Sequence, residues 1–141
     1  MPSSSPLDNL VRIGQLKPEP PDRDEFAGLL RSGRLRLEDA ATRDLSIESR
    51  FDLAYNAAHA LSLAALRWHG YRSENRYQVF QCLQHTLELP PENWRVLDQA
   101  HRKRNLAEYE GLLDVEEALV DGMVRAGRIV LDRLEKLPPI S

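Results

Sequence analysis

The sequence predicts an all-α protein, an antiparallel helical bundle of five to six helices. From residue 22 onward, apolar residues recur at intervals of three and four, which is typical of amphipathic helices. Residues that commonly start or stop helices separate these segments. No segment alternates apolar and polar residues between hairpin turns, so nothing in the sequence indicates a β-sheet. We expect the third, fourth, fifth and last helices to supply the core.

Residues 1–21 are expected to form a flexible N-terminal arm. Five prolines break any long helix in this stretch, and three consecutive serines add little apolar surface. Four apolar residues could still form one short docking turn: Leu7, Leu10, Val11 and Leu16. A loosely attached tail is the preferred interpretation. Residues 22–141 are then expected to form a single helical-bundle domain without internal repeats.

The first two helices of this domain are expected to be short. The segment "DRDEFAGLLRSG", residues 22–33, has apolar residues at helical spacing and is expected to stop at Gly33, because glycine often ends helices. The next segment, "LRLEDAATRDL", residues 35–45, is expected to turn Leu37, Ala40 and Ala41 inward.

The third helix is expected to begin near Ser46 and to end at Gly70. Serine is a good N-cap, and Glu48 in the first turn complements the helix dipole. The helix is apolar on two adjoining faces, so we expect neighbours on more than one side. One face carries Ile47, Phe51, Ala54, Ala58, Leu61 and Ala65, and the other carries Tyr55, Leu63 and Leu66.

The remaining helices also have expected boundaries. The fourth is expected to start at Ser73, and Pro91 suits the first turn of the fifth, which should end near Gly111. Asp114 and Glu117 have the spacing of a capping box and are expected to start the last helix.

Composition excludes several classes of function. Among 141 residues the net charge is −3, so no global positive field attracts nucleic acid. The single Cys82 excludes an internal disulfide and an all-cysteine zinc site, which favours a reducing, cytoplasmic setting. The first residues lack signal-peptide features, and no apolar run reaches membrane-spanning length. Without a glycine-rich phosphate loop or paired histidines, we expect no cofactor, no metal and no membrane partner.

The stretch "AHRKRNLAEYEG", residues 100–111, places polar residues where the helical pattern points toward the core. The stripe that begins with Trp94 and Leu97 continues, at i, i+3, i+4 and i+7, as His101, Arg104, Asn105 and Glu108. These residues could form an ordinary solvated face, in which an Arg104–Glu108 pair contributes roughly 0.3–0.5 kcal/mol. Their phase favours a binding face instead, because unpaired charge next to a core is costly. Arg102 and Lys103 add positive charge on other sides of the helix.

Two stretches resemble the HEPN superfamily (higher eukaryotes and prokaryotes nucleotide-binding), over roughly residues 46–137. They are "RFDLAYNAAHALSLAALRWHGYRSENRYQVFQCL" and "RKRNLAEYEGLL". The resemblance rests on an alanine-rich helix ending in "GYR", on Arg76 at the start of the next helix, and on "RN" before the last helix. It implies a homodimeric helical bundle that binds RNA or nucleotides. Family members often belong to toxin–antitoxin or defence systems, beside a nucleotidyltransferase or antitoxin partner.

Many HEPN proteins are metal-independent RNases. Their motif has an arginine and a histidine separated by four to six residues, and the first of these residues is polar. By this resemblance Arg104 matches the arginine and Asn105 the polar residue, but Tyr109 stands at the first histidine position. Tyrosine, with a pKa of about 10, is a poor base near neutral pH. His101, one turn before Arg104, could supply the missing imidazole. Arg95 and His101 also have the required spacing, but the residue after Arg95 is an apolar valine.

Three hypotheses follow for residues 101–109. The preferred one is a dimeric protein that binds RNA, a nucleotide or a protein partner without catalysis, with Arg104 gripping a phosphate. Its ligand-binding residues would be Arg104, Asn105, Glu108, Arg102 and Lys103. The second is an RNase that uses Arg104 with His101 or Tyr109 as catalytic residues. The third is a structural dimerisation module in which the polar face touches no ligand.

Overall fold

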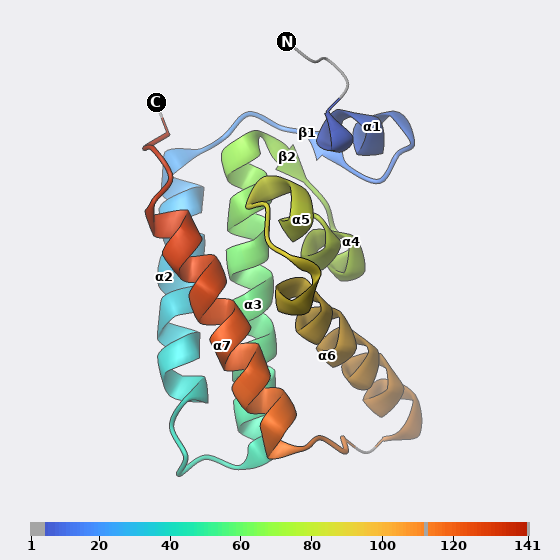
Figure 1. Cartoon of the computed structure of the whole chain (residues 1–141), viewed down its shortest axis with the longest axis vertical. Coiled ribbons are helices and arrows are strands. Elements are labelled where there is room, and N and C mark those ends of the chain that lie inside the picture. Colours follow the sequence, from blue (N-terminus) through green and yellow to red (C-terminus); the bar gives the residue numbers. More distant parts are fainter. Residues whose placement is uncertain (1–4, 112, 141) are drawn as a thin grey trace.

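A computed structural model describes residues 5–111 and 113–140 (Figure 1). The elements in chain order are α1 (Pro6–Arg12), β1 (Lys17–Pro18), α2 (Arg23–Ala40), α3 (Ile47–His69), β2 (Tyr71–Arg72), α4 (Arg76–Gln81), α5 (Leu83–Thr86), α6 (Pro91–Glu110) and α7 (Glu117–Glu135). The predicted all-α class is therefore confirmed. The expected arm and domain also include residues 1–4, 112 and 141, which lie outside the described residues.

Helix α3 is the centre of the fold. It packs against α2 and α7, and its other side meets β2 and helices α4, α5 and α6 (Figure 1). This many neighbours fit around one helix because α3 is rich in alanine, whose small side chain lets other helices approach closely. Phe51, Tyr55 and Leu61 fill the remaining space and are almost fully buried. The two apolar faces expected of this helix are thus both covered.

Helix α2 runs through the glycine at which the sequence predicted a stop. Gly33 is buried inside a single helix, so the expectation of two short helices in residues 22–45 is wrong. A Cβ atom at position 33 would lie 2.4 Å from Cγ and Cδ2 of Leu61 on α3. The glycine therefore serves close helix packing, and the backbone hydrogen bonds of the helix continue past it.

Several other helix ends lie where the sequence placed them. Ser46 caps α3, its hydroxyl accepting a hydrogen bond from the Ser49 amide at 3.1 Å. Gly70 and Gly111 end α3 and α6 with φ angles of 89° and 72°, the left-handed conformation that favours glycine. Pro91 is the first residue of α6.

Two predicted helix starts are wrong. The expected fourth helix begins at Arg76, because Asn75 and not Ser73 provides the cap, and it is interrupted at Cys82 to give α4 and α5. The last helix begins at Glu117 without a side-chain cap, so Asp114 heads no capping box. The backbone carbonyl of Asp114 instead accepts a hydrogen bond from the Lys103 ammonium at 3.2 Å.

The described part of the N-terminal segment packs on the bundle, which differs from the loosely attached tail expected from its prolines. Leu7 and Leu16 are buried in a small cluster with three residues of α3, α4 and their surroundings: Leu66, Val79 and Cys82. Strand β1 pairs antiparallel with β2, Lys17 opposite Arg72 and Pro18 opposite Tyr71. Within the described residues, no helix combines the length and apolar character needed to cross a bilayer.

Candidate functional site

Helix α6 directs part of its predicted polar cluster inward. Leu97 and Ala100 are fully buried against the bundle, which sets the orientation of the helix. His101 and Arg104 follow them by one turn and are half-buried beside α3 and α4. Asn105 lies at the exposed edge of the same cluster. The interruption of the apolar stripe thus places an imidazole and a guanidinium at the boundary between core and solvent.

His101 is held by contacts on both ring nitrogens. Its Nδ1 lies 2.9 Å from the hydroxyl of Tyr55, which projects from α3 and is 1% exposed. Its Nε2 lies 3.2 Å from the side-chain amide nitrogen of Asn105. The imidazole also stacks on the Tyr55 ring, with 6.3 Å between centroids, and meets the edge of Phe80. These contacts fix the ring in one orientation.

The protonation of His101 follows from these contacts. The Asn105 amide nitrogen can only donate, so Nε2 accepts and Nδ1 carries the proton that is donated to the Tyr55 hydroxyl. Burial lowers the pKa of His101, and the positive charges of Arg104 and Arg76 lower it further, against the raising effect of Asp98. The imidazole is therefore neutral at neutral pH.

Two guanidinium groups from different helices lie over the ring of Tyr55. The Arg104 guanidinium carbon is 4.9 Å from the ring centroid, and that of Arg76, from α4, is 5.3 Å away. Such cation–π contacts hold a guanidinium in place without neutralising it. Arg76 also donates a hydrogen bond to the side-chain carbonyl of Asn56 at 3.3 Å. Among the described residues, the one carboxylate paired with either arginine is Glu108, 3.2 Å from Arg104 and largely exposed.

A second imidazole lies in the same positive field. Burial and the charges of Arg76 and Arg104 lower the pKa of His59 to about 4, so this side chain is neutral at neutral pH. Its ring meets the edge of Phe80, with 6.3 Å between centroids. No hydrogen bond to another described residue occupies its ring nitrogens. We name the group of Tyr55, Asn56, His59, Arg76, His101, Arg104 and Asn105 the arginine–histidine cluster.

The other residues predicted for the site lie outside this cluster. Arg102 pairs with the buried Asp98 at 2.8 Å, and Lys103 binds the segment before α7. Tyr109 is 94% exposed, and no contact joins it to His101 among the described residues. Glu108 is linked to the cluster only through Arg104.

Next to the cluster, Arg104 and Glu108 also line an open cleft of about 470 Å³ between α3 and α6. Glu48 and Asp52 lie in its wall, so the cleft is acidic and disfavours an anion. An anionic ligand is therefore better accommodated on the side of Arg76 and His59. Within the described residues, no group of three or more His, Cys, Asp or Glu side chains is arranged to hold a metal ion.

The sequence pattern of α6 did not identify the α3 and α4 members of the cluster. Tyr55, Asn56 and His59 interrupt an otherwise alanine- and leucine-rich stretch at i, i+1 and i+4, which is the same kind of signal that singled out His101 and Arg104. Arg76 carries no such signal, because α4 is too short to show a stripe. Only the packing of α4 against α3 and α6 brings it to the site.

Comparison with protein-family models, curated proteins and solved structures finds no match to this chain.

Proposed function

We propose that the arginine–histidine cluster binds the phosphate groups of RNA or of a nucleotide. The observation that carries this proposal is the pair of guanidiniums over one tyrosine ring, from Arg76 and Arg104. Among the described residues, the one carboxylate that pairs with either of them is the exposed Glu108, which binds Arg104. Two guanidiniums beside one aromatic ring favour a bound anion, and the guanidinium fork matches phosphate oxygens in two hydrogen bonds. The resemblance to HEPN proteins supports the same class of ligand.

The remaining members of the cluster suit this ligand. Asn105 and the neutral His59 offer polar atoms near the guanidiniums, and Tyr77, 42% exposed on α4, offers an aromatic face on which a base could stack. The ligand would then contact side chains from three helices. RNA binding at this one local site is compatible with the net charge of −3, since no global attraction is needed.

A second candidate function, metal-independent RNA cleavage, is favoured by the orientation of His101. With Nδ1 held by Tyr55, Nε2 is the basic nitrogen. It would take the proton of a ribose 2′-hydroxyl, whose oxygen attacks phosphorus while the bond to the 5′-oxygen breaks. The imidazolium would return the proton to that 5′-oxygen, leaving a 2′,3′-cyclic phosphate and a 5′-hydroxyl. Arg76 and Arg104 would stabilise the charge that develops on the phosphate.

We expect Arg104→Lys to weaken binding of a short single-stranded RNA by about tenfold to a hundredfold, which is the range of one charged hydrogen bond. The substitution keeps the charge and removes the fork. Arg76→Lys should act in the same direction. Fluorescence anisotropy of a labelled oligonucleotide at low salt measures the change, and melting temperatures check that the fold is intact.

Arg95→Lys is the matched control for this experiment, because Arg95 is an exposed arginine on the same helix. We expect it to bind RNA as the wild type does. Arg102→Ala is unsuitable, since it would leave the buried Asp98 without its partner. The binding proposal is contradicted if wild type shows no affinity, or if both lysine variants bind normally.

The same samples decide between binding and cleavage. We expect the RNA to remain largely intact with and without EDTA, because Asn105 occupies the lone pair of the His101 Nε2. EDTA-insensitive production of 2′,3′-cyclic phosphate ends that is lost in His101→Ala would establish the second candidate function instead.

We also propose that the chain forms a two-fold homodimer through α6, as the HEPN resemblance implies. Leu106 and Tyr109 are 53% and 94% exposed on this helix, next to the arginine–histidine cluster. A second copy would bury both and bring the two clusters toward a shared groove. The same resemblance leads us to propose that the dimer binds a nucleotidyltransferase or an antitoxin in the cytoplasm. The buried free thiol of Cys82 suits a reducing compartment.

We expect light scattering to give the mass of a dimer at micromolar concentration, and Leu106→Glu to shift the protein toward the monomer. Glutamate at this position would remove the apolar contact of the leucine and would place an unpaired carboxylate in the interface. Ile13→Glu, at another exposed apolar residue near the N-terminus, should leave the mass unchanged. A wild-type protein that stays monomeric at every concentration would disprove the dimer.

A further inference from the structure

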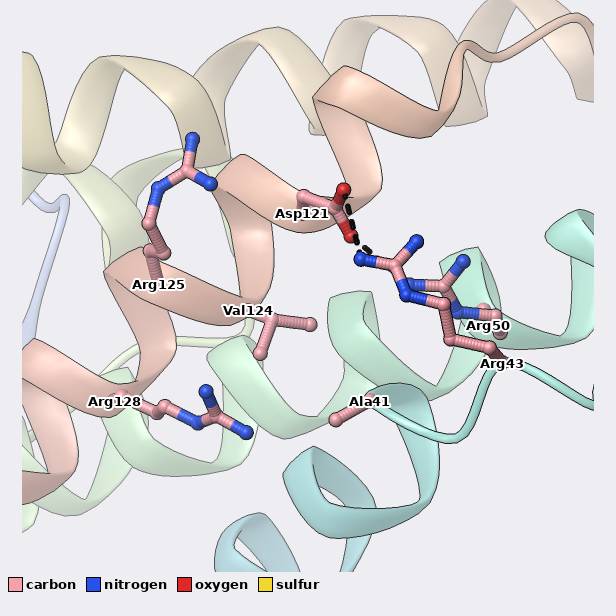
Figure 2. A pocket seen from close by; sticks show the side chains of 7 residues that line it. All are labelled: Ala41, Arg43, Arg50, Asp121, Val124, Arg125 and Arg128. Carbon is pink, nitrogen blue, oxygen red and sulfur yellow. Dashed lines mark hydrogen bonds and ion pairs between the residues drawn. The ribbon is translucent and has the colours of Figure 1, made fainter.

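A second group of arginines surrounds a pocket on the opposite side of the α3 N-terminus from the acidic cleft. The pocket encloses about 320 Å³ and lies between the end of α2, the start of α3 and α7. Its lining residues are Ala41, Arg43, Arg50, Asp121, Val124, Arg125 and Arg128. Figure 2 shows Arg43 and Arg50 on one side and the two arginines of α7 on the other. None of these residues belongs to the arginine–histidine cluster.

One side of the pocket is rigid because Arg50 is buried and fully engaged. Its side chain is 3% exposed, and its Nε donates to the carbonyl of Ala40 at 2.8 Å. Its two terminal nitrogens donate to Glu117 at 2.6 Å and to Asp121 at 3.0 Å. A planar group held at three points has little freedom left. Arg50 therefore fixes the two carboxylates at the edge of the pocket.

These carboxylates are already satisfied by arginine. Arg43 approaches Glu117 at 2.6 Å and Asp121 at 3.4 Å, so each carboxylate is shared by two guanidiniums. Burial raises the pKa of Asp121, but hydrogen bonds from Arg50 and Arg43 outweigh this and hold it below its ordinary value. Asp121 is thus ionised, and its oxygens are directed toward these two partners (Figure 2).

The α7 side of the pocket carries charge that nothing in the described chain neutralises. Arg125 and Arg128 follow Asp121 at i+4 and i+7 and are exposed on the same face of the helix. No ion pair joins either of them to a carboxylate among residues 5–111 and 113–140. Four guanidiniums thus meet two carboxylates, which leaves an excess of two positive charges around the pocket.

The floor of the pocket is apolar and its width is set by close helix packing. Ala41 and Val124 form the floor between the two charged sides (Figure 2). On α7, Gly127 is buried against α2, where an added Cβ would lie 2.7 Å from Cδ2 of Leu37. This approach holds the two helices together next to the pocket. The site therefore combines one rigid side, a small apolar floor and unneutralised guanidiniums on the other side.

We propose that this pocket binds a terminal phosphate monoester carried by a nucleotide. A phosphate monoester carries nearly two negative charges at neutral pH, which matches the excess charge, whereas a phosphodiester carries one. The phosphate would lie between Arg43 and Arg128, with Arg125 at the rim. The volume is at the lower end of that of small-molecule sites and suits a mononucleotide. The source is either a free nucleoside 5′-monophosphate or the 5′-phosphate of an RNA end.

A heteronuclear NMR titration tests this proposal, because amide signals of residues 121–128 report on this pocket separately from those of α6. The probes are adenosine 5′-monophosphate, inorganic phosphate, and one oligouridine prepared with a 5′-phosphate and with a 5′-hydroxyl. We expect the nucleotide to shift the α7 signals. Arg128→Gln should weaken this binding by about tenfold or more, as expected for loss of a charged hydrogen bond.

Two variants complete the design. Arg31→Gln removes the same charge from an exposed position on α2 and should bind the nucleotide as wild type does. Arg104→Gln removes a residue of the arginine–histidine cluster and should leave the α7 shifts unchanged. The proposals for the two sites can therefore be disproved separately. Stronger shifts with the 5′-phosphorylated oligouridine than with adenosine 5′-monophosphate would identify the RNA end as the source. We expect inorganic phosphate to bind more weakly than the nucleotide, and equal binding would contradict a nucleotide as the carrier of the phosphate.

Three further results would overturn the proposal. They are absence of α7 shifts in wild type at millimolar nucleotide, unchanged nucleotide binding in Arg128→Gln, and α7 shifts of equal size from both oligouridines. The last would show that the terminal phosphate plays no part.

Discussion

Arg67→Met is expected to lower the free energy of unfolding by about 3–5 kcal/mol, the usual cost of removing one partner from a buried ion pair. The Arg67 side chain is 1% exposed. Its guanidinium binds the Glu25 carboxylate at 2.7 Å and the backbone carbonyls of Pro20 and Glu19 at 2.7 and 2.9 Å. These bonds join α3 to the start of α2 and to the segment after β1. Methionine fills similar space but leaves the carbonyls of Pro20 and Glu19 without this donor, and it leaves Arg72 as the remaining arginine bound to Glu25.

Urea unfolding followed by circular dichroism measures this effect. Arg34→Met is the matched control, because it removes an exposed arginine that pairs with Glu135 on the surface at 3.0 Å. Exposed pairs contribute about 1 kcal/mol or less. Equal destabilisation by the two variants would contradict the clamping role of Arg67.

The same variant should also alter the response to acid. Burial raises the pKa of Glu25, but hydrogen bonds from Arg67 and Arg72 outweigh this and hold it below its ordinary value of 4.5. A carboxyl whose pKa is lower in the folded state stabilises the protein above pH 4.5, and this contribution is lost as the pH falls through the folded pKa. We expect this acid-dependent loss to be smaller in Arg67→Met than in wild type.

Gly33→Ala is expected to destabilise the protein by about 2–3 kcal/mol, although alanine is the better helix former by about 1 kcal/mol. The new methyl group would lie 2.4 Å from the Cγ and Cδ2 atoms of Leu61, whose side chain is fully buried and cannot move aside freely. Relief requires that α2 and α3 separate, which opens the packing along both helices.

Gly28→Ala, on the same helix, is expected to stabilise the protein. A Cβ at position 28 would meet nothing within 4 Å, so only the gain in helix propensity remains, about 0.5–1 kcal/mol of added stability. Thermal unfolding of the two alanine variants should therefore give shifts of opposite sign. A stabilised Gly33→Ala protein would show that the α2–α3 contact is more adaptable than its geometry indicates.

These glycines illustrate which parts of the fold the sequence could predict. Ser46, Gly70 and Gly111 were placed correctly because capping depends on local backbone geometry, which a few residues determine. Gly33 was misassigned because its role depends on Leu61, which is distant in sequence. A local pattern does not distinguish a glycine that ends a helix from one that allows another helix to approach.

The candidate site also contains residues that the sequence pattern indicated and residues that only the packing of helices brings together. The phase of α6 predicted that His101 and Arg104 turn toward the bundle, and both are half-buried, since helical periodicity relates spacing to direction. It also included Arg102 and Lys103, whose partners are Asp98 and the segment before α7. Arg76 entered the cluster only through the packing of three helices, and single-helix periodicity carries no information about such packing.

The two guanidiniums over the ring of Tyr55 have a consequence for the energetics of folding. Folding holds both positive charges next to one aromatic ring, whereas unfolding lets them move apart. An anion bound at the cluster as proposed would act as a counter-ion to these charges and would stabilise the folded state. Because Asn56, Tyr55 and Glu108 already hold both arginines, little side-chain ordering remains for the ligand to impose. Under this proposal, occupancy of the site and the free energy of unfolding would be coupled, so that each would report on the other.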